Sequence, residues 1–355
     1  MNVLSLFDGM SCGQIALKEL GIKVDNYFAS EIDSHAINQT KYNFPNTIHL
    51  GDVTKVSGYN LPKIDLLIGG SPCQGFSFAG KQLNFDDPRS TLFFEFVRIL
   101  KELREVNPNI KFLLENVRMK KDSERVITEI LGVYPVVINS SLVSAQNRVR
   151  LYWSNIRVKK EGLFSELHTD VPQPKDKGLL LKDILEPEVD KKYFVKNPKL
   201  GFEGMNINDK GNTLRTGGKA SQSKKHNYDL ICVAMRGRPK DGKNQQQLEP
   251  RYDNKTNCLT SVEKDNLILS IYQRPRGANK GGFFAEKTPT ISANSWEQNN
   301  LIVSSSIRRL TPKECARLQT IPDWYKWVCS ETQTYKMLGN GWTVEVIKHI
   351  FQYLK

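Results

Sequence analysis

Patterns that would form a metal site or a disulfide framework are missing from this sequence. The six cysteines and five histidines are scattered, with no C-x-x-C pair and no H-E-x-x-H segment. Structural zinc sites and disulfide-rich domains depend on such spacings. The sequence therefore predicts neither a metal nor disulfides, and it favours a reducing compartment, the cytoplasm.

Long apolar runs are also absent. A membrane-spanning helix needs about 18 or more consecutive apolar residues, and no such stretch occurs, so we expect no membrane span. The chain opens directly on a strand-like segment, Val3–Phe7, in place of a basic and then apolar leader. We therefore expect no targeting leader.

Positive charge is what the sequence has in excess. Lysine and arginine total 51 against 38 aspartate and glutamate, which gives a net charge of +13. Such a balance favours a polyanionic partner, most simply nucleic acid, although a basic protein without one remains the alternative. A chain of 355 residues is long enough for a full core and two domains.

Short apolar strands alternate with amphipathic helices from Val3 to about residue 156. This order predicts an α/β fold, a Rossmann-like doubly wound and mostly parallel sheet. The clearest helix opens at Ser90, a good N-cap, and ends at Pro108. The predicted strands are Val3–Phe7, Asn26–Glu31, Thr47–Leu50, Asp65–Ile68, Lys111–Leu114, Val136–Asn139 and Val149–Trp153.

The first three strands each end in a residue suited to a nucleotide. A glycine-bearing turn, Phe7–Gly13, follows the first strand, Glu31 ends the second, and Asp52 follows the third. In this architecture the first turn binds the nucleotide and an acidic residue about 20 positions later holds the ribose hydroxyls. The turn has no lysine or threonine for phosphates, which favours an adenosine cofactor without a phosphate chain. Surface carboxylates at strand ends are the less specific interpretation.

A thiol and a carboxyl follow the next strands. Cys73 lies in Gly69–Ser77 after the fourth strand, and Glu115 follows Leu114 at the end of the fifth. Because parallel strands end at one edge, the two side chains form a plausible nucleophile and acid/base pair. The alternatives are a buried free cysteine and a carboxylate that only binds loop amides.

Two arginines open the seventh predicted strand. In the segment Gln146–Arg150, alternate residues project to one side, so Gln146, Arg148 and Arg150 share a face. This arrangement suits an anion or a base carbonyl, and a solvated basic edge is the alternative.

Composition changes between about residues 157 and 305, where polar residues and Gly-rich turns dominate. Three loosely similar units begin at Asn212, Asn257 and Pro289, which indicates irregular β-hairpins in a small domain. Arginine is the commonest reader of guanine in the major groove. The arginines placed for groove or phosphate contacts are Arg215, Arg236, Arg238, Arg274 and Arg276.

The chain then returns to the first domain. Thr311-Pro312-Lys313-Glu314 is a capping box with proline at the first helical position. The final helix carries Ile347, Ile350, Phe351 and Leu354 on one stripe, which would pack on the sheet.

Six short segments resemble the motifs of the DNA (cytosine-5) methyltransferase family and follow one another along the chain in the order of those motifs. Gln74-Gly75-Phe76-Ser77 after Cys73 resembles the bacterial and phage form, and Arg89–Leu100 and Val143–Asn155 are also similar to the animal de novo enzymes. The resemblance covers roughly residues 1–156 and 306–355. The six segments are Phe7–Gly9, Ser71–Ser77, Glu115–Val117, Gln146–Arg150, Arg309–Gln319 and Gly339–Val344.

The resemblance implies a role for each of these residues. Cys73 would attack C6 of a flipped-out cytosine, Glu115 would engage N3 and the exocyclic amine, Arg150 would contact O2, and Arg148 would help to position Cys73. Gln74, Ser77 and Gln146 would contact DNA. S-adenosylmethionine would be bound by Phe7, Asp8, Gly9, Met10, Ser11, Glu31, Ile32, Asp52, Val53, Pro72, Asn340 and Thr343.

The resemblance also implies the division of the chain and its partners. Residues 1–156 and 306–355 would form the catalytic domain, and 157–305 a target-recognition domain for double-stranded DNA. A cognate restriction endonuclease would be a further partner. A tRNA cytosine-5 methyltransferase and a catalytically inactive DNA-binding regulator remain the alternatives.

Overall fold

The computed structural model describes residues 1–71, 91–146, 148–179, 181–193 and 311–354. Between residues 233 and 309 it describes the backbone of six short strands.

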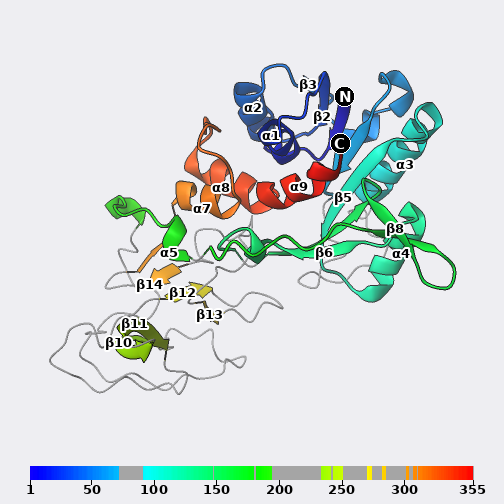
Figure 1. Ribbon diagram of the computed structural model, residues 1–355. Helices are drawn as coiled ribbons and strands as arrows, with labels where there is room; N and C mark the ends of the chain where they lie inside the picture. Colours follow the sequence, from blue (N-terminus) through cyan, green and yellow to red (C-terminus); the bar gives the residue numbers. More distant parts are fainter. Residues whose placement is uncertain are drawn as a thin grey trace, which may run out of the picture.

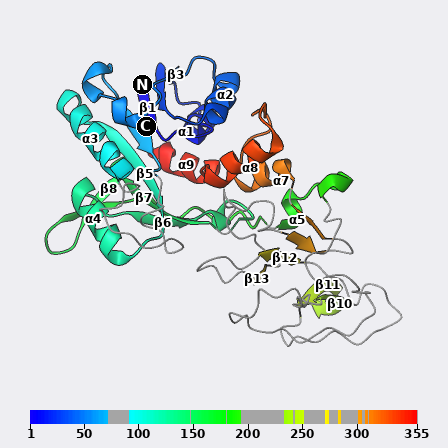
Figure 2. The same ribbon diagram turned by 180° about the vertical axis from the view of Figure 1, so that it is seen from behind.

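A seven-stranded sheet forms the centre of the molecule (Figures 1 and 2). Its strand order is β3-β2-β1-β4-β5-β7-β6, and only β7 runs antiparallel to its neighbours. This confirms the predicted Rossmann-like, mostly parallel fold. The strands are β1 (Asn2–Leu6), β2 (Asn26–Ser30), β3 (Ile48–His49), β4 (Leu66–Gly69), β5 (Lys111–Val117), β6 (Val136–Asn139) and β7 (Val149–Ser154).

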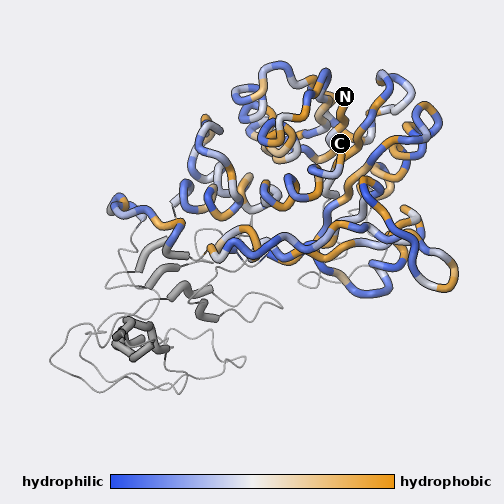
Figure 3. Tube along the Cα trace, in the orientation of Figure 1, coloured by the Kyte–Doolittle hydropathy of each residue, from blue (hydrophilic) through white to orange (hydrophobic). Residues whose placement is uncertain are grey.

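Helices cover both faces of this sheet, because the central strands are apolar on both sides. Leu113 of β5 packs with α1 (Cys12–Glu19) and α9 (Val344–Phe351), whereas its neighbours Phe112 and Leu114 pack with α3 (Thr91–Val106) and α4 (Lys121–Leu131). Apolar residues accordingly gather along the strands in Figure 3. Because helices cover both faces, the carboxyl ends of β1, β2, β4 and β5 form the edge where a ligand can bind.

The C-terminal segment completes the face covered by α1. The capping box is confirmed at the start of α7 (Pro312–Leu318): Glu314 N–H donates to Thr311 Oγ1 at 3.1 Å, and Thr311 N–H to Glu314 Oε2 at 2.8 Å. After α8 (Glu331–Asn340), α9 lies beside α1, so the two ends of the chain meet (Figure 1). Of the predicted buried stripe, Ile347, Ile350 and Phe351 are confirmed, whereas Leu354 lies beyond the end of α9 in a 3₁₀ turn and is only partly buried.

The end of β5 differs from its predicted position. The apolar run ends at Leu114, where pairing with β4 also ends, but pairing with antiparallel β7 continues to Val117. Glu115 therefore lies within the strand, opposite Tyr152, and not after it. In the other direction, β7 begins at Val149, as predicted. Of the three residues expected to share a strand face, Gln146 and Arg148 precede the strand and only Arg150 lies within it.

Residues after 156 stay attached to this sheet for some distance. β8 (Val158–Glu161) and β9 (Glu166–Thr169) form a hairpin, and Thr169 N–H donates to Tyr134 O at 2.9 Å. Lys177 N–H donates to Leu142 O at 2.8 Å. A short helix, α5 (Leu181–Ile184), follows and lies against α7.

Antiparallel strands also occur in the polar region, as the hairpin-rich composition predicts. β10 (Val233–Lys240) pairs with β11 (Lys243–Pro250), and four further strands form a sheet in the order β13-β12-β14-β15. These are β12 (Ser270–Gln273), β13 (Gly282–Phe284), β14 (Leu301–Val303) and β15 (Ile307–Arg309). The opening segments of the three predicted units lie outside the described residues.

Candidate active site

The turn between β1 and α1 adopts an uncommon backbone conformation. Phe7 and Ser11 both have positive φ angles, 58° and 66°, although neither is glycine. Glu31 fixes this turn from the end of β2, because its Oε2 accepts the Gly9 N–H at 2.8 Å. Its Oε1 accepts the N–H groups of Ile32 and Asp33, both at 2.8 Å. Strained residues held by neighbouring groups are typical of functional sites.

Asp8 is enclosed beneath the same turn. The Tyr27 hydroxyl donates to Asp8 Oδ1 at 2.9 Å. Burial raises the pKa of the Asp8 carboxyl to about 6, against the opposing hydrogen bonds from Ser5, Ser11 and Tyr27. The neighbouring charge of Glu31 acts in the same direction as burial.

The raised pKa of Asp8 predicts a pH-dependent stability. The folded protein binds this proton more tightly than the unfolded chain, so the contribution is full below about pH 4 and is lost as the pH rises through about 6. Asp8→Asn keeps a hydrogen-bond acceptor for Tyr27 and cannot ionise. Between pH 4.5 and 7.5, we expect the melting temperature of Asp8→Asn to fall less than that of the native protein. An equal fall in the two proteins would contradict the raised pKa of Asp8.

Asp52 lies at the third strand end, before the 3₁₀ turn η1 (Val53–Lys55). Its Oδ1 accepts the Thr54 N–H at 3.0 Å, and this bond lowers the pKa of the carboxyl. Ser30 Oγ donates to Gly51 O at 2.8 Å, which ties the turn to β2. Just after β2, Ile32 directly follows Glu31 and keeps 76% of its surface exposed. Carboxylates beside an exposed apolar side chain suit a ribose and a planar base.

Glu115 is held by two donors on the other side of the site. Arg150 Nε lies 2.9 Å from Glu115 Oε1, and the Trp342 indole N–H donates to Oε2 at 3.1 Å. Sequence reasoning assigned Trp342 no role, although it lies within the last family-like motif. The carboxylate is thus oriented by one residue of β7 and one of the C-terminal segment.

Gly70 leaves the space that this arrangement needs. A Cβ atom there would lie 2.9 Å from Trp342 Nε1 and 3.1 Å from Glu115 Oε2. The rigid indole cannot yield as a flexible chain end would. We expect Gly70→Ala to lower kcat about tenfold, with a smaller effect on the melting temperature, because it displaces Glu115. Steady-state kinetics test this, and an unchanged kcat would contradict the tight fit.

Arg148 organises the turn that carries Trp342. It is buried, and its Nη1 and Nη2 donate to Gly339 O at 3.4 Å and Gly341 O at 2.9 Å. Burial, with the nearby charge of Arg150, lowers the pKa of the Arg148 guanidinium to about 10, so it remains charged at neutral pH. The predicted contact with Cys73 lies outside the described residues.

Thr343 and Asn340 occupy different environments. The Thr343 side chain is 1% exposed; its hydroxyl donates to Gln319 Oε1 at 3.0 Å and accepts from Ser140 Oγ at 2.9 Å. This hydroxyl therefore joins the C-terminal segment to the sheet. Asn340 is exposed at the end of α8, and its predicted role in the cofactor pocket stays a prediction.

Gln146 presents a buried amide that lacks a protein partner in the described part of the chain. Its exposed fraction is 0%, and neither its Nε2 nor its Oε1 has a hydrogen-bond partner there. Buried amides without partners are rare in folded proteins, and a ligand or water commonly satisfies them. The predicted contact of Gln146 with DNA stays a prediction.

Of the remaining predicted site residues, the structure describes the backbone of two. Arg236 and Arg238 lie in β10, paired with Gln247 and Gln245 of β11. Within the described ranges, no cluster of three or more potential metal ligands occurs, and no helix there is both long and apolar enough to cross a membrane. Those not described are Pro72, Cys73, Gln74, Ser77, Arg215, Arg274 and Arg276.

Comparison with known families gives a match over the whole chain. The sequence model for "C-5 cytosine-specific DNA methylase" matches residues 1–355. The type II methyltransferase M1.ScrFI of Lactococcus lactis subsp. cremoris is 31% identical over 364 residues, which cover 98% of this chain and 76% of that protein. The orphan methyltransferase M.SPRI of Bacillus phage SPR is 28% identical, with coverage of 100% and 97%.

Solved structures share the fold. A putative DNA modification methyltransferase encoded within an E. coli prophage superposes with a TM-score of 0.58 at 22% identity, covering 100% of this chain and 98% of that one. The S. pombe Dnmt2 methyltransferase gives a TM-score of 0.57 at 18% identity, with the same coverage.

Proposed function

The chain belongs to the C-5 cytosine-specific DNA methylase family, and from that premise we propose which of its residues carry the methyl transfer to cytosine in DNA. The arrangement that best supports the proposal is the Glu115 carboxylate, fixed by Arg150 and Trp342 at the ligand-binding edge of the sheet.

S-adenosylmethionine is the cofactor that the family implies, and the residues at the first three strand ends fit it. Bound there, it would supply an electrophilic methyl group on a sulfonium. Glu31 accepts three backbone N–H groups, and a carboxylate has about four acceptor positions, so one stays free for a ribose hydroxyl. Ile32 offers an apolar surface to the adenine, and Asp52 a second carboxylate. Phe7–Ser11 would surround the methionine moiety.

Cys73 is the nucleophile in this proposal. Its thiolate sulfur would add to C6 of the cytosine and make C5 nucleophilic, so that C5 could take the methyl group as the bond between that methyl and the donor sulfonium breaks and the donor leaves as a neutral thioether. Loss of the C5 proton to water and cleavage of the S–C6 bond would then restore the aromatic ring and the thiolate. A pyrimidine carbon is too weak a nucleophile without this addition. The base must leave the duplex for the sulfur to reach it.

Glu115 and the two arginines assist this addition. The Glu115 carboxyl would engage cytosine N3 and the exocyclic amine. A proton given to N3 draws electron density from C6 and so favours the addition of the thiolate. Arg150, already bonded to Glu115, would contact O2. Arg148 acts through the turn at Gly339 and Gly341, which carries Trp342 to the carboxylate. Gln146 would satisfy its amide on the extruded nucleotide.

Sequence recognition falls to the region between the two catalytic parts. Because residues 157–179 remain bonded to the catalytic sheet, we place the start of the recognition domain beyond residue 193 and its end near Arg309, where β15 pairs with β14. Arg236 and Arg238 of β10 are candidates for groove contacts. Bacterial and phage relatives support a cytoplasmic enzyme acting at the nucleoid, with or without a cognate restriction endonuclease.

DNA is favoured over tRNA because the family model that matches the whole chain is named for DNA. A filter-binding assay with duplex DNA and tRNA tests this choice. Bisulfite sequencing of DNA from cells that express the protein tests the activity itself. Methylcytosine at one sequence context is the expected result. Its absence, with the protein folded, would favour the inactive regulator.

A further inference from the structure

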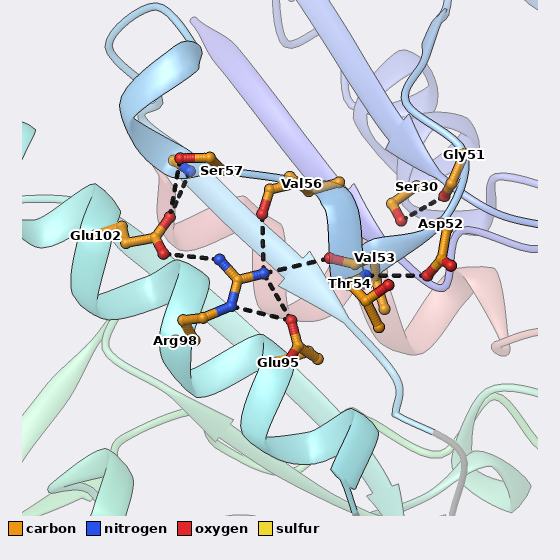
Figure 4. A network of polar contacts seen from close by, with 11 residues as sticks. Ser30, Gly51, Asp52, Val53, Thr54, Val56, Ser57, Glu95, Arg98 and Glu102 are labelled. Carbon is orange, nitrogen blue, oxygen red and sulfur yellow. Dashed lines mark hydrogen bonds and ion pairs between the residues drawn. The ribbon is translucent and has the colours of Figure 1, made fainter.

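An arginine on α3 binds the segment that follows the third strand end (Figure 4). Arg98 Nη2 donates to Val56 O at 2.9 Å and to Val53 O at 3.4 Å. Two carboxylates of the same helix hold the guanidinium: Glu95 Oε2 lies 2.6 Å from Nη2, and Glu102 Oε1 lies 2.7 Å from Nη1. The planar guanidinium is thus fixed on three sides, as arginine's fork of donors allows.

Glu102 extends this contact to the following turn, η2 (Gly58–Asn60). Its Oε2 accepts the Gly58 N–H at 2.6 Å. Gly58 lies directly on α3, since a Cβ there would come within 2.9 Å of Glu102 Cβ. We call Arg98, Glu95 and Glu102 the α3 bracket. The bracket holds residues 53–58 against the helix at three backbone groups.

Asp52 lies between this bracket and a second anchor. On one side Ser30 binds Gly51 O from β2, and on the other Arg98 binds Val53 O. Ordinary ion pairs on a helix surface contribute little and contact no other segment. The α3 bracket differs because its guanidinium spans from the helix to two carbonyls of the loop.

We propose that Arg98 is a positioning residue for the cofactor, which fixes the Asp52–Val53 turn so that the Asp52 carboxylate meets the cofactor in one geometry. The proposal rests on the proposed use of S-adenosylmethionine and deepens it. Arg98 itself touches no substrate; it acts through Val53 and Val56. Loss of the Arg98 side chain keeps the Asp52 carboxylate but lets the turn adopt several conformations. The cofactor must then order the turn when it binds, which lowers its affinity.

The test is Arg98→Met, which keeps an unbranched apolar stem on the helix and removes the donors. Titration calorimetry with S-adenosylmethionine, well below the melting temperature, is expected to show a Kd about tenfold higher. The KM for the cofactor should rise to a similar extent, while kcat at saturating cofactor and the KM for DNA stay within about twofold. Arg98→Lys should recover part of the affinity.

Arg157→Met is the matched control. Arg157 forms a comparable ion pair, with Nε 2.8 Å from Asp170 Oδ2, and it has no contact with this turn among the described residues. This variant should leave the Kd unchanged. If Arg98→Met does not fold, Glu102→Gln, which frees one side of the guanidinium, takes its place with a smaller expected loss. A lower melting temperature with an unchanged Kd would mean that the bracket is only structural and would overturn the proposal.

A double-mutant cycle with Asp52→Ala decides whether Arg98 acts through Asp52. The two losses in affinity should be less than additive, because Arg98 cannot position a carboxylate that is absent. Additive losses would refute the proposed route. If the native protein binds no S-adenosylmethionine, the proposed function itself fails. Native binding with an unaffected variant would remove only the inference on Arg98.

Discussion

Cys73→Ala is expected to abolish turnover, with a loss of at least about 10⁴-fold in kcat, because the proposed covalent addition at C6 depends on its thiolate. Alanine differs from cysteine only in lacking the sulfur atom. Binding of S-adenosylmethionine and of duplex DNA should therefore persist. Incorporation of a labelled methyl group into DNA measures the first effect, and filter binding the second.

A trapping experiment gives the complementary result. DNA that contains 5-fluorocytosine cannot lose a proton from C5 after methyl transfer, so the native protein should remain covalently bound to it through Cys73. The complex should survive denaturing electrophoresis, and Cys73→Ala should form none. Appreciable methylation by Cys73→Ala, or trapping that persists in it, would refute the covalent step.

Glu115→Gln should be the second most damaging change, with kcat lower by about 10²–10³-fold. Glutamine has nearly the same shape, so its oxygen can still accept from Arg150. Its NH₂ group, however, would then face the Trp342 indole N–H, another donor, and it cannot give a proton to N3. Single-turnover kinetics with saturating DNA and cofactor measure the chemical step directly.

Trp342→Phe serves as the control for this variant. It removes the indole donor and leaves the carboxyl ionisable, so kcat should fall much less than in Glu115→Gln. Equal losses in the two variants would show that Glu115 matters only as a partner of Trp342. Full activity of Glu115→Gln would contradict its role at N3.

The sequence predicted the sheet well because its strands are short apolar runs, and both bounds of β6 agree with the structure. It placed Glu115 outside β5 because the apolar pattern ends at Leu114. The residues beyond stay in the strand only through pairing with β7, a neighbour more than thirty residues later in the chain that no local pattern reveals.

The links between the two ends of the chain were equally hidden. Arg148 was recognised as a site residue, but its bonds to Gly339 and Gly341 join segments 191 and 193 positions apart. The α3 bracket reads in the sequence as ordinary helical ion pairs at i,i+3 and i,i+4 spacing. Only the fold brings Val53 and Val56 to the guanidinium. Side-chain type can be read locally, whereas its partner depends on tertiary packing.

The meeting of the chain's two ends has a consequence during synthesis. The Tyr325 hydroxyl donates to Met10 O across 315 positions, and α9 packs on α1. Contacts of such high sequence separation form late and slow folding. On the ribosome, the apolar face of α1 therefore stays uncovered until nearly the whole chain, including α9, has emerged. We expect nascent and C-terminally truncated chains to depend on chaperones and to methylate no DNA.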